Sequence, residues 1–117
     1  METQVTVRRE DGTVLCAHCV VAETMLSRAR GLLGRAELPP GEGILLRPAS
    51  SIHMFFMRFA IDAVFLDRSL VVRKVVHRLR PWRMAFGLGS HAVLELSAGE
   101  AARHGVAPGE RLSATAQ

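Results

Sequence analysis

Short runs of β-branched and apolar residues, separated by glycine, proline and other turn-forming residues, recur along this chain. Runs of this length and composition are typical of β-strands. Asp11-Gly12 predicts a turn between the first two runs, and Pro39-Pro40-Gly41 must lie in a loop because proline cannot donate to a sheet ladder. The predicted strands cover residues 3–8, 13–21, 43–47, 52–58, 63–67, 70–77, 91–96 and 110–114.

Two segments have helical periodicity instead. Between residues 22 and 33, apolar residues recur at three- and four-residue steps, and Thr24 is a candidate N-cap. Ser97 and Glu100 form a capping-box pattern before a second, two-turn helix that Gly105 would end. The absence of a regular strand–helix alternation argues against a doubly wound sheet. We therefore predict a mainly β (β-rich α+β) fold, a small antiparallel sandwich or partly closed barrel with two short helices in its connections.

A chain of 117 residues predicts a single domain, residues 1–117, because two domains of half that size would have marginal cores. The hydrophobic fraction of 49% and charged fraction of 22% are typical of a globular protein and exclude a disordered or collagen-like chain. No apolar run approaches the ~18 residues of a membrane span. The polar start does not resemble a signal peptide, so we expect a cytoplasmic protein with reduced thiols.

The formal net charge of +4 is concentrated in the second part of the chain. A basic run between residues 73 and 83 surrounds Trp82, an arrangement that can stack and neutralise a nucleic-acid strand. A solvated strand edge, where charges block unwanted pairing, explains the same run and is favoured, since a single tryptophan is thin support. Arginines also suit a small anionic ligand or an acidic protein partner, and the composition of a GC-rich genome would give the same balance.

Cys16-Ala17-His18-Cys19 is the motif most suggestive of a metal or redox site. A second cysteine pair is absent, so a zinc ion would need a distant ligand such as His53. In a regular strand, Cys16 and Cys19 point to opposite faces and chelate together only across a bulge. The alternative, which we favour, is that both thiols are small core residues.

Residues 51–62 hold three of the five phenylalanines and two of the five methionines. If extended, this segment is apolar on both faces, as in a central buried strand. His53 and Asp62 would then form a base with its orienting carboxylate, and Arg58 an anion clamp. The structural alternative is that Arg58 and Asp62 neutralise each other while His53 bonds a backbone carbonyl, and it is the favoured one.

Four stretches carry a resemblance that none of them would carry alone: residues 27–35, 41–45, 56–67 and 93–99. In this order and spacing they resemble the domain of unknown function 192 family, an uncharacterised bacterial and archaeal family, over about residues 20–112. The resemblance implies a small β-rich domain and no established activity. The chain differs from the family pattern at Phe56, where tryptophan is common, and in the short connection between Met57 and Asp62.

The resemblance brings forward six polar residues embedded in its motifs. A buried ion-pair network that fixes helix against sheet would need arginines there, and so would a small anion-binding pocket. The candidate pocket residues, with His53 added, are Arg28, Arg30, Glu42, His53, Arg58, Asp62 and Glu95.

No nucleophile elbow and no phosphate-binding glycine loop occurs in the sequence. The leading hypothesis is therefore a binding or accessory module without assignable catalysis, whose partner is a protein or a small anionic ligand. The alternatives are a metal- or thiol-dependent enzyme that uses Cys16, Cys19 and His53, with zinc as its cofactor, and an arginine-mediated nucleic-acid or anion binder.

Overall fold

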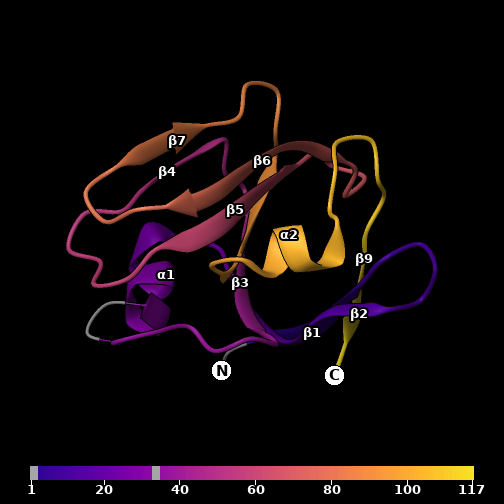
Figure 1. The fold of residues 1–117 in the computed structure, drawn as a ribbon, viewed down its shortest axis with the longest axis horizontal. Helices are drawn as coiled ribbons and strands as arrows, with labels where there is room; N and C mark the ends of the chain where they lie inside the picture. The colour runs from indigo at the N-terminus through magenta and orange to yellow at the C-terminus, as the bar shows by residue number, and fades with distance from the viewer. Residues whose placement is uncertain (1–2, 33–34) are drawn as a thin grey trace.

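The computed structural model describes residues 3–32 and 35–117, and the side chains of residues 30 and 31 fall outside this description. Strands predominate, and two short helices lie in the connections, which confirms the predicted mainly β class (Figure 1). The elements in chain order are β1 (Thr3–Arg8), β2 (Val14–Ala22), α1 (Met25–Leu32), β3 (Glu42–Leu46), β4 (Ser51–His53), β5 (Ile61–Leu66), β6 (Val72–Leu79), β7 (Met84–Phe86), β8 (Ala92–Ser97), α2 (Glu100–His104) and β9 (Ser113–Ala116).

Seven strands form one mixed sheet in the order β6-β5-β8-β3-β2-β1-β9, and β4 pairs with β7 in a second, two-stranded sheet. All pairs are antiparallel except β2 with β3, where His18 pairs with Glu42. The large sheet is not closed into a barrel. Its two edges meet at one end, because Leu70 and Val72 exchange backbone hydrogen bonds of 2.7–2.9 Å with residues 109–112.

The large sheet is buried on both faces, each with its own core. Along β8, Leu94 and Leu96 point into one core, while Val93 points into the other. Ala101 of α2 belongs to the first core, and Leu32 of α1 belongs to the second. Strands β4 and β7 contribute to the second core as well. The alternation places Glu95 on the same face as α1, as residues one apart in a strand require.

Helix α1 begins as predicted. The Thr24 hydroxyl oxygen accepts the backbone N–H of Ser27 at 3.1 Å, and the Ser27 hydroxyl accepts the backbone N–H of Thr24 at 3.2 Å. This reciprocal cap satisfies donors at a helix start that have no partner within the helix. The helix then buries Arg28 and Leu32 but leaves Met25 and Leu26 exposed. Its apolar face is therefore only partly covered.

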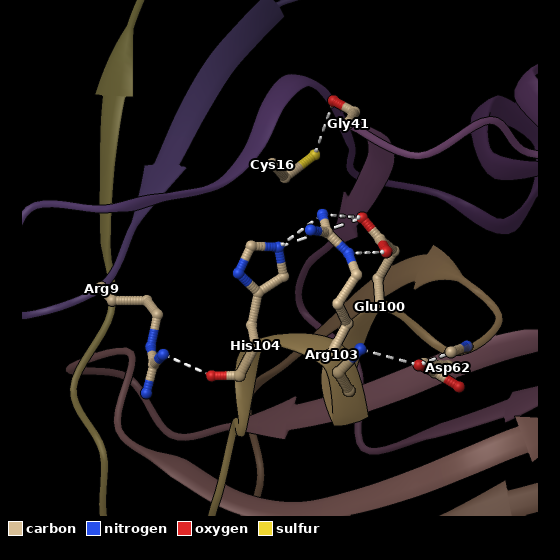
Figure 2. A network of polar contacts seen from close by, with 9 residues as sticks. Arg9, Cys16, Gly41, Asp62, Glu100, Arg103 and His104 are labelled. Atoms are coloured by element: carbon tan, nitrogen blue, oxygen red, sulfur yellow. Dashed lines mark hydrogen bonds and ion pairs between the residues drawn. The ribbon is translucent and has the colours of Figure 1, made fainter.

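The predicted capping box of α2 is wrong. The N-cap is Gly99, with a positive φ of 96°, and the cap comes from Asp62 on β5 (Figure 2). One oxygen of Asp62 accepts the backbone N–H groups of Gly99 and Ala101, each at 2.9 Å. Its other oxygen accepts the backbone N–H of Arg78 at 2.9 Å, where β6 has a positive φ of 51°. The buried carboxylate thus joins β5, β6 and α2.

Other contacts hold α2 at its surface and its C-terminal end. Glu100 pairs with Arg103 one turn later at 2.7 Å, so its carboxylate is not a capping-box acceptor. The guanidinium of Arg9 donates to the carbonyl of His104 (Figure 2) and pairs with Glu110. Gly105 has the left-handed conformation, φ 70°, which confirms it as the C-terminal cap.

The prediction of a buried strand through residues 52–58 is wrong beyond His53. Strand β4 ends there, and the chain turns at Phe55 and Phe56, the latter with a φ of 66°. Backbone hydrogen bonds of 2.8 Å join Met54 to residues 82 and 83, which lead into β7. This pairing between segments thirty residues apart is invisible to local periodicity. Its consequence is that Phe55 and Phe56 are exposed.

Candidate functional site

A buried ion pair lies between α1 and the centre of the large sheet. Nε of Arg28 lies 2.9 and 2.8 Å from the two carboxylate oxygens of Glu95, and Nη2 lies 2.5 Å from Oε1. Arg28 is 4% exposed and Glu95 is fully buried. Burial raises the pKa of Glu95, while the hydrogen bonds and charge of Arg28 act in the opposite direction. The sequence left two interpretations of these motif residues, a buried ion pair that fixes helix against sheet and a small anion-binding pocket. The geometry is compatible with both, because the pair is buried and also borders a cavity.

The Arg28 guanidinium has further partners beside Glu95. Nη1 donates to the backbone oxygen of His53 at 3.0 Å, and Nη2 approaches Sδ of Met54 at 3.8 Å. An arginine side chain carries five N–H donors. The contacts with Glu95, His53 and Met54 engage four of these, so one N–H on Nη1 has no acceptor among the residues that the structure describes.

A cavity of about 340 Å³ opens beside this arginine. Helix α1 forms one wall, and the end of β4 with the turn that follows forms the other. Its volume is at the lower end of the range for small-molecule sites, and an apolar lining with few polar groups is typical of such sites. Among the lining residues that the structure describes, Arg28 and His53 alone carry polar side chains. The lining residues are Met25, Leu26, Arg28, Ala29, Leu32, His53, Phe55, Phe56 and Met57.

Aromatic side chains form a stacked row at the rim of the cavity. The ring of His53 stacks on Phe55 with centroids 4.6 Å apart, and Phe55 stacks on Trp82 at 5.9 Å. Trp82 also contacts Phe56 edge-on at 4.9 Å. Phe56 and Trp82 both have positive φ, 66° and 67°, and are 69% and 59% exposed. Strained backbone that presents apolar rings to solvent is characteristic of functional rather than purely structural segments.

The structure brings three of the predicted pocket residues together, Arg28, His53 and Glu95. Glu42 lies elsewhere, in a half-exposed pair with Arg35 at 3.2 Å. Arg58 is exposed. The Arg30 side chain lies outside the described residues.

Asp62 is not a partner of His53 or Arg58, and this corrects the constellation expected from the sequence. Asp62 points from β5 toward α2, on the sheet face opposite Glu95, and its oxygens are engaged by three backbone N–H groups. Nδ1 of His53 instead accepts the backbone N–H of Phe55 at 3.3 Å. Because β5 alternates, a histidine on the α1 side and a carboxylate on the α2 side cannot act as one acid–base unit.

Cys16 and Cys19 do point into the same core, by the bulge that their spacing requires. Val5 pairs with Cys19 and Val7 with Cys16, so one residue of β1 between these pairs faces two residues of β2. The contact with Cys16 and burial together raise the pKa of Cys19, and the thiol of Cys16 lies 3.6 Å from the carbonyl oxygen of Gly41. His53 belongs to the other face. In residues 3–32 and 35–117, no three potential metal ligands converge, so the structure does not bring His53 together with Cys16 and Cys19, as the alternative metal site requires.

The basic run of residues 73–83 begins on β6, an edge strand of the large sheet, and continues into the turn that follows it. Its residues Arg73, Lys74, His77, Arg78 and Arg80 are exposed. This location agrees with the expected role of charges at a sheet edge.

Sequence reasoning missed the aromatic rim and the exposed half of α1. The helical periodicity of residues 22–33 predicts one apolar face that includes Met25 and Leu26, and the apolar pattern of residues 51–62 predicts a buried strand through Phe55. The width of this apolar stripe could have indicated the exposed half of α1, because its residues span more of the helix surface than one contact with the sheet covers.

The fold and this site define a small β-rich protein with an apolar pocket built over a buried arginine–glutamate pair. The chain belongs to the DUF192 family, described as "Uncharacterized ACR", whose model matches residues 6–114. It is 38% identical over 87 residues to a UPF0127 protein of Thermococcus sibiricus, an alignment that covers 66% of this chain. The matched stretch spans 52% of that relative, about half of its length.

Two crystal structures have a similar fold. One is a protein from Sinorhizobium meliloti described as a "putative transcription regulator", with a TM-score of 0.81, 23% identity and coverage of 97% of this chain and 94% of that one. The other, of unknown function, comes from Novosphingobium aromaticivorans, with a TM-score of 0.78, 28% identity and coverage of 94% and 83%. The first likeness concerns the fold alone.

Neither helix within the described part of the chain is long and apolar enough to cross a membrane.

Proposed function

We propose that residues 1–117 form a single-domain binding module, and that its ligand is a small amphipathic anion. The observation that carries the proposal is the cavity between α1 and the turn after β4, whose described lining is apolar except for Arg28 and His53. An apolar wall binds the body of a ligand, and a few fixed polar groups orient it.

The ligand's head group follows from Arg28. Its free Nη1 donor needs an acceptor, and a charged acceptor such as a carboxylate forms the stronger hydrogen bond. Because Glu95 already neutralises part of the Arg28 charge, the head group must be an anion that binds without displacing Glu95 from Arg28.

Octanoate and phenylacetate are suitable probes, with octylamine as a control of the same apolar body and opposite charge. Trp82 is the single tryptophan of the chain and contacts both aromatic residues of the rim, so its fluorescence reports occupancy directly. We expect saturable quenching or a spectral shift with the carboxylates. Amide chemical shifts should change in α1 and residues 53–57.

Ala29→Phe fills the cavity and leaves Arg28 in place, so it should abolish these changes. Ala102→Phe is the matched control, because Ala102 is exposed on α2. Carboxylate binding that survives Ala29→Phe, or shifts that avoid α1, would contradict the proposal. Equal binding of octylamine would contradict the role of Arg28.

A further inference from the structure

The turn between β7 and β8 projects beyond the rest of the ribbon at the top of Figure 1. Side chains alternate along it. Ala85 and Gly87 are buried, whereas Met84, Phe86 and Leu88 are 50%, 59% and 97% exposed. Met84 and Phe86 lie two positions apart in β7 and therefore point to one side of the strand. Leu88 lies in the turn that follows β7. These three exposed residues, here called the apolar tip, lie outside the cavity described above.

The apolar tip is held in place and is not a frayed loop. Gly87 donates its backbone N–H to Ser50 at 2.8 Å, and its carbonyl accepts from Ser90 at 2.9 Å. A Cβ at Gly87 would lie 2.3 Å from a ring carbon of Phe65, so only glycine allows this close approach to the core. The protein therefore presents Phe86 and Leu88 to solvent on a fixed scaffold.

Positive charges lie beside the apolar tip. Nζ of Lys74 donates to the backbone oxygen of Phe86 at 2.8 Å, and the Arg73 guanidinium lies within 3.5 Å of the Cβ position of Gly89. Arg68 lines a hollow with Gly89 and His91. The carboxylate in this hollow, Asp67, is occupied by the backbone N–H groups of residues 69 and 71 at 2.8 and 3.0 Å.

We propose that the apolar tip binds the surface of an anionic phospholipid bilayer, with Phe86 and Leu88 inserted at the interface and Arg68, Arg73 and Lys74 against lipid phosphates. Apolar side chains flanked by basic ones are the chemistry of peripheral membrane attachment. A second copy of this chain fits less well, because a two-fold contact through the tip would bring both sets of cations together. The phosphates of an anionic bilayer would instead neutralise Arg68, Arg73 and Lys74.

Vesicle co-sedimentation tests the proposal. Vesicles of phosphatidylcholine with 30% phosphatidylglycerol should bind the protein, and pure phosphatidylcholine should bind it weakly. Binding should fall with added salt, because surface charges are screened. Arg73→Gln with Lys74→Gln should weaken partitioning by about tenfold or more, since each cation contributes near an anionic surface. The double variant Phe86→Ser with Leu88→Ser should also weaken partitioning, whatever the charge of the vesicles.

Val14→Ser is the matched control, an exposed apolar residue of β2 that belongs neither to the tip nor to the cavity lining. It should leave vesicle binding unchanged. Unchanged folding of each variant is checked by circular dichroism and unfolding midpoint. The proposal is overturned if the anionic vesicles do not bind the protein, or if the tip variants bind them as well as the parent chain does.

Depth of insertion gives a second, independent readout. In a Trp82→Phe background, Leu88→Trp places the single fluorophore at the apex of the turn. Its emission should shift to the blue on anionic vesicles and become accessible to lipid-borne quenchers. A blue shift that appears with protein concentration in the absence of vesicles, together with a dimer in sedimentation velocity, would assign the tip to a second copy and overturn the lipid proposal. A shift caused only by an acidic protein would also overturn it.

Discussion

Arg28 of α1 and Glu95 of β8 form a buried pair in which three N–O distances are 2.9 Å or less. The two residues are separated by 67 positions in the sequence and fix the helix against β8, an interior strand of the large sheet. The same guanidinium forms part of the cavity wall. A change at this pair therefore affects both stability and the proposed site, and the two effects must be measured separately.

Glu95→Ala should destabilise the protein by about 3–5 kcal/mol, because it leaves the Arg28 charge buried and unpaired. Arg28→Met combined with Glu95→Leu should recover most of that loss, since a well-packed apolar pair removes both desolvation costs. Urea unfolding of the single and double variants provides the comparison. If Glu95→Ala changes the free energy of unfolding by less than about 0.5 kcal/mol, the pair has no structural role.

Asp62→Ala should destabilise the protein by at least about 2 kcal/mol, because it leaves three backbone N–H groups without their acceptor. Asp62→Asn retains one acceptor oxygen and should lie between Ala and the parent chain. Amide hydrogen exchange should accelerate at Gly99 and Ala101 before the rest of the sheet responds. Arg58→Ala, at an exposed position, should stay within about 0.5 kcal/mol. If Asp62→Ala had the same stability as the parent chain, the structural role would be contradicted and a functional role for Asp62 would be indicated.

Much of the fold is predictable from local pattern, because each strand of the large sheet carries its own run of β-branched and apolar residues. The exceptions are elements whose conformation depends on distant residues. The turn after His53 exists because Met54 pairs with residues 82 and 83. The cap of α2 comes from Asp62, and no local pattern shows a capping group 37 positions away.

The candidate site was predicted in its components but not in its arrangement. Arg28 and Glu95 were both singled out as polar residues within apolar motifs, and their burial as a pair is one of the two alternatives proposed for them. Asp62 was grouped with them, yet strand alternation places it on the opposite sheet face. The bulge that turns Cys19 toward Cys16 depends on β1, so the spacing of the two cysteines alone does not reveal it.

Gly43→Ala should destabilise the protein, because a Cβ there would lie 2.7 Å from the backbone oxygen of Glu95 and 2.9 Å from Sγ of Cys16. Overpacking of this kind costs about 1–3 kcal/mol. Cys16→Ala in the same chain should relieve only part of the strain, since the backbone oxygen remains. Thermal or urea unfolding of both variants tests this, and full rescue by Cys16→Ala would show that β3 and β8 separate readily.

Glu100 predicts a pH-dependent contribution to stability. The hydrogen bond from Arg103 lowers the pKa of Glu100, so the folded state binds fewer protons than the unfolded state. The contribution is present above the ordinary glutamate pKa of about 4.3 and is lost as the pH falls through the lower, folded value. Arg103→Ala should lower the stability slightly at pH 7 and have no effect once Glu100 is protonated at low pH, and carboxyl NMR should show the pKa of Glu100 rising.

The two thiols should react only when the protein unfolds. Cys16 and Cys19 are fully buried, and this burial keeps reagents from both thiols. The hydrogen bond between them raises the pKa of Cys19 and lowers that of Cys16, so the pKa disfavours a thiolate at Cys19 alone. Labelling with a disulfide reagent should be slow in native buffer, and destabilising substitutions such as Asp62→Ala should accelerate it in proportion to the unfolded population. Native mass spectrometry of protein purified with zinc provides the companion measurement. Rapid labelling of both cysteines, or a stoichiometric zinc adduct lost on denaturation, would revive the thiol or metal chemistry that the opposite placement of His53 argues against.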